Sequence, residues 1–139
     1  MTRFVLDASV ALRWFLSNPV PAYARRVRRL ILDGARAVVP ALWHLEMANG
    51  LTVAERRGIV TVGDADQSLT DIEGLLGQAI ESDPALVSVQ QALTTARTFK
   101  LSAYDAVYLD VARRERLPLA TLDEDLRAAA AHAGVALIR

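Results

Sequence analysis

Four acidic residues stand in stretches of sequence that are otherwise largely apolar. Asp7 directly follows RFVL, Asp123 directly follows LATL, Glu46 lies within VPALWHLEMANGL, and Asp105 lies within LSAYDAVYLDVA. A carboxylate that faces low-dielectric surroundings is costly unless it is hydrogen-bonded, paired with a positive charge or bound to a cation. These four residues are therefore the first candidates for chemistry.

Each acid also has an ordinary structural interpretation, and the residues alone leave both interpretations open. Asp7 and Asp123 are suitable N-caps for the helices that follow them. Asp105 fits the third position of a helix capped by Ser102, in a capping box. Glu46 has no capping role in the middle of its helix, so its ordinary interpretation is solvent exposure.

Taken together, the four acids predict a cation site if they converge. Two like charges about 4 Å apart repel by roughly 4 kcal/mol at an effective dielectric of 20, so a cluster requires protons or a cation. Oxygen ligands without His or Cys favour Mg²⁺ or Mn²⁺ over Zn²⁺. Such a site can activate water and stabilise a leaving oxygen in phosphodiester hydrolysis.

Two hydroxyl residues accompany the acids that follow strands. Ser9 lies two residues after Asp7, and Thr121 lies two residues before Asp123. Ser9 is suited to capping its own helix or to orienting a ligand. Thr121 shares a strand side with Asp123, where it either supports the site or bonds the backbone.

The elements that must position these residues alternate along the chain. Strands are expected at residues 3–6, 35–39, 79–82, 119–122 and 135–138. Helices are expected at residues 9–16, 22–33, 40–57, 64–76, 83–100, 102–114 and 123–133, with Asp83 as the cap of the fifth and Pro84 in its first turn. This alternation predicts a mainly parallel sheet covered on both faces, with ligands at the carboxyl ends of its strands.

Length and composition favour one compact domain spanning residues 1–139, and they exclude several chemistries. The 139 residues include no cysteine, which excludes disulfides and thiolate catalysis. No charge-free run approaches the roughly 20 apolar residues of a membrane span, so a soluble cytoplasmic protein is expected. Sixteen basic and sixteen acidic residues balance, so nucleic-acid binding would depend on local patches or metal. The 53% hydrophobic content favours a homodimer.

Several motifs resemble the PIN-domain ribonucleases, in particular the VapC-type toxins of bacterial toxin–antitoxin pairs. They are FVLDASVAL, VPALWHLEMANGL, LSAYDAVYLDVARRERLPLATLDEDL and the closing AGVALI. YDAVYLDVA followed by PLATLD is the most specific part, whereas residues 58–100 match only in helical character and length. The resemblance implies a three-layer α/β/α PIN domain with a mainly parallel central sheet.

The resemblance also implies an endoribonuclease that uses Mg²⁺ or Mn²⁺ and is inhibited by a small antitoxin protein. The four acids of the family fall on Asp7, Glu46, Asp105 and Asp123. Asp7 and Asp105 would be the most direct metal ligands, and Glu46 would orient or deprotonate the attacking water. Asp123 would complete the acidic pocket, contacting the metal either directly or through water. The residues that would support the ligands or the scissile phosphate are Ser9, Asn49 and Thr121.

Other features have simpler interpretations. Arg25–Arg29 forms either a solvated helix face or a phosphate-binding patch. Asp125 fits a favourable acid at a helix start, and the aromatic residues Trp14, Phe15 and Trp43 fit the core. Asp110 is expected on the solvated face, whereas Asp105 is expected to face Asp7.

Two other classes of protein compete with the nuclease interpretation. The first is a PIN-like module that binds RNA or protein without cutting, but such a module would not need to gather four charges. The second is a phosphatase or phospho-receiver domain, which also places an aspartate after its first strand. That class would require a second acid where this chain has Ser9, or a lysine near the phosphate, and the only lysine is Lys100.

Overall fold

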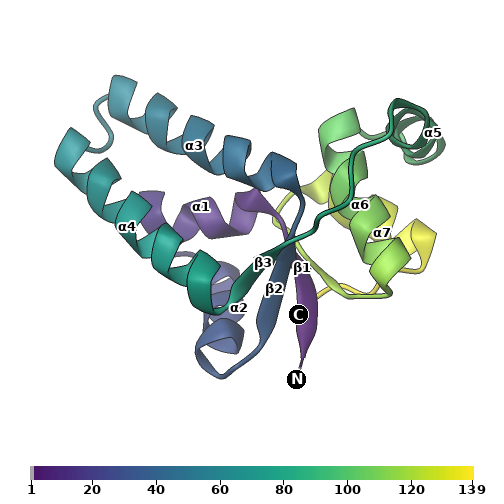
Figure 1. Cartoon of the computed structure of the whole chain (residues 1–139), viewed down its shortest axis with the longest axis horizontal. Helices are drawn as coiled ribbons and strands as arrows, with labels where there is room; N and C mark the ends of the chain where they lie inside the picture. The colour runs from purple at the N-terminus through teal and green to yellow at the C-terminus, as the bar shows by residue number, and fades with distance from the viewer. Residues whose placement is uncertain (1) are drawn as a thin grey trace.

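A four-stranded parallel sheet lies between two groups of helices in the computed structural model, which describes residues 2–139 (Figure 1). The strands are β1 (Arg3–Leu6), β2 (Arg36–Val39), β3 (Ile80–Ser82) and β4 (Leu119–Ala120). Their order across the sheet is β3-β2-β1-β4, and each neighbouring pair is parallel. The predicted α/β class with a parallel central sheet is confirmed.

Seven helices cover the two faces of this sheet within the described residues. They are α1 (Ala8–Leu16), α2 (Ala22–Leu32), α3 (Ala41–Arg56), α4 (Val62–Gln78), α5 (Val89–Phe99), α6 (Ala103–Glu115) and α7 (Glu124–Ala133). Figure 1 shows α1 to α4 on one side of the strands and α5 to α7 on the other. No helix within residues 2–139 is long and apolar enough to cross a membrane.

The order of the strands reverses at β1, which places its carboxyl end at a switch point. The chain passes from β1 to β2 and β3 on one side, and it later returns to β4 on the other side. Asp7 follows β1 and Asp123 lies three residues after the end of β4, so the two acids share one rim. The backbone N–H of Asp7 donates to the Ala120 carbonyl at 3.0 Å. Open parallel sheets bind ligands at such a point.

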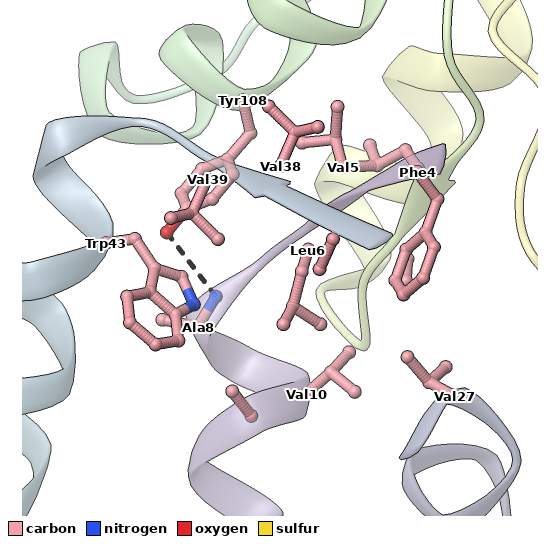
Figure 2. Close-up of a cluster of buried hydrophobic side chains, with 14 of the residues drawn as sticks. Phe4, Val5, Leu6, Ala8, Val10, Val27, Val38, Val39, Trp43 and Tyr108 are labelled. Carbon is pink, nitrogen blue, oxygen red and sulfur yellow. Dashed lines mark hydrogen bonds between the residues drawn. The ribbon is translucent and has the colours of Figure 1, made fainter. Parts of the chain in front are cut away.

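The central strand β1 is buried on both faces, which explains its uninterrupted apolar sequence. Phe4, Val5 and Leu6 have no exposed surface. Trp43 of α3 and Tyr108 of α6 pack beside the end of β1, as Figure 2 shows. Of the other predicted core aromatics, Trp14 and Phe15 are half-buried and pack against this core.

Close packing of α1 against α3 fixes the position of the helix that carries Glu46. Gly50 lies where the two helices meet, and a Cβ atom on Gly50 would lie 2.5 Å from a methyl carbon of Leu12. A larger residue at this position would therefore require the Leu12 side chain to shift.

The fifth helix begins later than predicted. Asp83 is not its cap, because the backbone N–H of Asp83 donates to the Val39 carbonyl at 2.7 Å and its carboxylate pairs with Arg114 at 2.6 Å. The helix starts after Ser88, whose hydroxyl accepts the N–H of Gln91 at 3.3 Å. Residues 83–88 cross the sheet edge without regular structure.

The last predicted strand is reduced to a single bridge. Leu137 pairs only with Leu119, because β4 itself ends at Ala120. Beyond this point the Thr121 carbonyl accepts from Arg127 at 2.8 Å, and the Ile138 carbonyl accepts from the Tyr23 hydroxyl at 2.8 Å. Side chains therefore occupy carbonyl groups that a longer sheet would use.

The prediction that Asp110 lies on a solvated face is wrong. Its Oδ1 accepts a hydrogen bond from the Thr95 hydroxyl at 2.6 Å and another from Gln91 at 3.3 Å. Asp110 is therefore half-buried against α5.

Candidate functional site

Asp7 is the most enclosed of the four candidate acids, with 4% of its surface exposed. The hydroxyls of Ser9 and Thr121 both donate to Oδ2 of this carboxylate, each at 2.7 Å. Asp7 occupies the N-cap position of α1, but its side chain makes no capping hydrogen bond. The buried charge is therefore held by two hydroxyl groups rather than used to start the helix.

Backbone donors fix the direction in which both hydroxyls point their protons. The N–H of Leu122 donates to Ser9 Oγ at 3.1 Å, and the N–H of Asp123 donates to Thr121 Oγ1 at 3.0 Å. Because each hydroxyl accepts from the backbone, its own proton remains for Asp7. Ser9 thus supports the neighbouring acid and does not cap its own helix, the alternative that the sequence also allowed.

Asp123 combines two of the roles considered from sequence. Its Oδ1 accepts the N–H of Leu126 at 2.9 Å and so caps α7. Its carboxylate also raises the pKa of Asp7 and of Asp105 by charge repulsion, so it lies within electrostatic reach of both. Helix capping and membership of the acid cluster are therefore compatible in one residue.

Glu46 is held by a buried tyrosine that the sequence analysis did not identify. The Tyr108 hydroxyl donates to Glu46 Oε1 at 2.6 Å and accepts from the backbone N–H of Ala8 at 3.4 Å, the contact drawn in Figure 2. Tyr108 has no exposed surface. One side chain therefore connects the acid on α3 to the turn that follows Asp7. The available signal was its spacing, since Tyr108 lies three residues after Asp105 and shares its helix face.

Asp105 lies at the start of α6, where Ser102 accepts its backbone N–H at 3.1 Å. Half of the predicted capping box is thus present. The Asp105 carboxyl is half-buried and interacts with the charges of the other three acids. Asp105 and Asp110 lie on one helix but face different surroundings.

The four acids form a single electrostatic cluster. Burial raises the pKa of Asp105 to about 6, and repulsion from Asp123, Asp7 and Glu46 adds to this effect. Burial also raises the pKa of Asp7, although the Ser9 and Thr121 hydroxyls oppose the rise. Burial raises the pKa of Glu46, which the Tyr108 hydroxyl opposes and the charge of Asp7 reinforces. The cluster holds more negative charge than its surroundings stabilise, which favours binding of a cation.

The donor set fits a hard divalent ion that keeps part of its water shell. The groups are carboxylate and hydroxyl oxygens, which Mg²⁺ and Mn²⁺ prefer. Within residues 2–139, no three His, Cys, Asp or Glu side chains are gathered closely enough to hold one ion directly. Mg²⁺ usually takes one or two carboxylates and reaches other groups through water.

Most of the remaining candidates are exposed to solvent. Asn49 is exposed on α3, three residues after Glu46, and Asp125 is exposed in the first turn of α7. The His44 ring bonds the Ser82 hydroxyl at 2.7 Å, and His132 is exposed. Neither histidine joins the acids.

Comparisons with known proteins agree with this architecture. A sequence model of the family described as PIN domain matches residues 4–132. A search of curated proteins found no significant match. The solved structure of PAE2754 from Pyrobaculum aerophilum is similar at a TM-score of 0.67, with 26% identity over 92% of this chain and 79% of that chain.

Two further solved structures share the fold at lower identity. FitAcB from Neisseria gonorrhoeae has a TM-score of 0.56 and 19% identity, covering 98% of this chain and 96% of that chain. A domain of a functionally unknown protein from Methanocaldococcus jannaschii has a TM-score of 0.57 and 16% identity, covering 99% and 90% of the two chains.

Removing the Tyr108 hydroxyl should disturb Glu46 specifically. In Tyr108→Phe, the carboxyl of Glu46 loses the donor that stabilises its ionised form, so its pKa should rise. The free energy of unfolding should fall by about 1 kcal/mol. Carbon-detected NMR titration of the metal-free protein measures the pKa. The control is Tyr104→Phe, on the exposed side of the same helix. An unchanged Glu46 pKa in Tyr108→Phe would contradict this role.

Removing the charge of Asp105 should stabilise the metal-free protein at neutral pH. The pKa of Asp105 is raised from 3.8 to about 6 on folding, so the native state binds its proton more tightly than the unfolded chain. Stability is therefore lost as the pH rises from about 4 to about 6. Because solvent screens this half-buried group, Asp105→Asn should gain only about 1 kcal/mol, or about 3 °C in Tm, at pH 7.

Thermal unfolding in the presence of EDTA measures this gain across the pH range. The difference between Asp105→Asn and the wild type should vanish only near about pH 3, below the pKa of Asp105 in both the native and the unfolded state. A lower Tm for Asp105→Asn at pH 7 would show that the acid is stabilised, rather than repelled, by its surroundings.

Proposed function

Since this chain belongs to the PIN-domain family, whose members are generally metal-dependent nucleases, we propose that it is an endoribonuclease that uses Mg²⁺ or Mn²⁺. We further propose that it is the toxin of a VapC-type toxin–antitoxin pair, composed of one domain and acting in the cytoplasm. The motifs around Asp7, Glu46, Asp105 and Asp123 support this assignment.

The buried carboxylate of Asp7 is the observation that carries the proposal. It lies at the switch point of the sheet, two hydroxyls are oriented toward it, and Asp123, Glu46 and Asp105 lie within electrostatic reach. A protein that only bound RNA would gain nothing from burying negative charge beside more negative charge, because phosphate is itself an anion. A divalent cation reconciles the acids with an anionic substrate.

Asp7 and Asp105 would hold the ion, and the hydroxyls of Ser9 and Thr121 fix the orientation of the Asp7 carboxylate. When bound, a divalent ion lowers the pKa of water and stabilises negative charge on the leaving oxygen. Glu46 would orient or deprotonate the attacking water, with its own position fixed by the Tyr108 hydroxyl.

Asp123 and Asn49 would have supporting roles in the proposed site. Asp123 completes the acidic pocket while it caps α7, which keeps its carboxylate at the rim. Asn49 is exposed on the helix that carries Glu46 and would contact the substrate rather than the ion.

A small antitoxin and a second copy of the chain are the proposed protein partners. Large apolar side chains are exposed in two regions, and monomeric proteins seldom expose extended apolar surface. On α3, α4 and the turn between them they are Leu45, Ile59, Val62 and Leu69; on α5 and the segment before it they are Leu86, Val87, Val89 and Leu93. These side chains provide surface for such partners to cover.

Metal-dependent cleavage of RNA tests the function directly. Purified protein freed of antitoxin should cleave RNA with Mg²⁺ or Mn²⁺, and EDTA should abolish cleavage. Asp105→Asn should lower the rate by about a hundredfold or more, because it removes a metal ligand and a charge. Electrophoresis of end-labelled RNA measures the rate.

Asp110→Asn is the matched control, since it makes the same chemical change on the same helix. Asp110 contacts Thr95 and Gln91 of α5 and not the acid cluster. Its substitution should leave the cleavage rate within about twofold of the wild type. Cleavage that survives EDTA or Asp105→Asn would assign the activity to another site or to a contaminant, and binding without cleavage would favour the non-catalytic module.

A further inference from the structure

We propose that the RNA strand continues from the acid site onto an arginine track along α2, which binds its phosphates. The track consists of Arg127, Arg26, Arg25, Arg28, Arg29 and Arg139. The proposal rests on the proposed function, because it identifies the surface that holds the same substrate beyond the scissile phosphate.

The track borders a shallow hollow of about 570 Å³ on the surface. Arg25, Arg26, Arg28, Arg29 and Arg139 line this hollow, and the rest of its lining is apolar: Ala22, Leu30 and Leu32. No acidic residue within 2–139 contributes to the lining. The ion pairs formed inside the described part of the chain use Arg3, Arg36 and Arg114 instead. Within residues 2–139, the guanidinium groups of the track therefore form no direct ion pair with a carboxylate.

A specific set of contacts joins the track to the acid site. Arg127 lies one helical turn after Asp123, and its Nη1 donates to the Thr121 carbonyl at 2.8 Å. Its guanidinium lies over the Tyr23 ring, with Cζ 5.2 Å from the ring centre. Arg26 of α2 lies over the same ring at 5.5 Å. Tyr23 thus brings Arg127, which is bonded to a residue of the acid site, together with Arg26 of α2.

Two guanidinium groups at one ring concentrate positive charge, which favours binding of an anion nearby. Stacking on an aromatic face also leaves the N–H edges of an arginine available to phosphate oxygens. Within α2, Arg25 and Arg29 are one turn apart and exposed, so they extend the positive surface along the helix axis.

Charge balance explains why such a track is needed. The whole chain has no net charge, so no global field attracts a polyanion. The acid cluster itself repels phosphate, and one divalent ion offsets only part of its charge. Phosphate contacts outside the cluster would supply the remaining affinity, as they do for nucleic-acid-binding proteins in general.

RNA binding in EDTA tests the track without cleavage. The probes are fluorescein-labelled single-stranded RNAs of mixed sequence, about 6 and about 20 nucleotides long. Protein is titrated into each RNA at salt concentrations from about 50 to about 200 mM, and fluorescence anisotropy measures the Kd. In the double variant Arg25→Gln/Arg29→Gln, the Kd for the longer RNA should rise about tenfold at the lowest salt. The slope of log Kd against log salt should fall by about 1.4, or 0.7 for each lost contact.

The double variant Arg56→Gln/Arg57→Gln is the matched control. It makes the same change in net charge with exposed arginines at the end of α3, far from α2 in Figure 1. This control should change Kd by less than about twofold. An equal loss of affinity in the two double variants, or no loss in either, would overturn the track. Equal Tm values for the double variants and the wild type exclude a folding defect.

Three further measurements distinguish RNA from other occupants of the track. They also distinguish failure of the track from failure of the proposed function. Displacement of the RNA by poly-glutamate at equal charge concentration would overturn the track in favour of an acidic peptide. A change of oligomeric mass in Arg25→Gln/Arg29→Gln, measured by light scattering, would overturn it in favour of a second copy. Arginine-dependent binding without cleavage in Mn²⁺ would support the track while refuting the nuclease. Unimpaired RNA binding by Arg25→Gln/Arg29→Gln, together with normal RNA cleavage, would refute only the track.

Discussion

Burial of the Asp7 carboxylate at the carboxyl end of β1 is the constraint on which the rest of the site depends. A charge with 4% exposure at a sheet rim needs donors, and the chain supplies them from Ser9 and Thr121. Those hydroxyls are in turn oriented by N–H groups of the segment that follows β4. The parallel pairing of β1 with β4 therefore creates the rim and also aligns the groups that make the buried charge tolerable.

The same arrangement costs stability in the absence of a cation. Burial and mutual repulsion raise the pKa values of Asp7, Glu46 and Asp105, so folding brings together charges that the unfolded chain keeps apart. Tyr108 limits this cost at Glu46 by donating a hydrogen bond, and its burial in the core keeps that donor in place. Because the carboxylates repel one another when no cation is bound, the cluster is well suited to bind a divalent ion.

Sequence reasoning located the rim because strands can be recognised from short apolar runs and acids that follow them stand out. Asp7 and Asp123 could thus be placed from local pattern alone. Tyr108 could not, because an aromatic residue on an apolar helix face has the pattern of a core residue, and only tertiary packing reveals its partner Glu46. The position of Asp110 was mispredicted for a related reason: periodicity identifies the face of a helix but not the neighbouring helix that covers it.

Calorimetric titration with Mn²⁺ shows whether the acid cluster binds a divalent cation, as the arrangement of its carboxylates predicts. The wild type should bind Mn²⁺ at about pH 7.5 and more weakly at about pH 5, because protons compete for a cluster in which the pKa of Asp105 is about 6. Asp7→Asn should bind far more weakly at both pH values. Absence of binding by the wild type at about pH 7.5, or equal binding by Asp7→Asn, would show that the acid cluster is not a cation site.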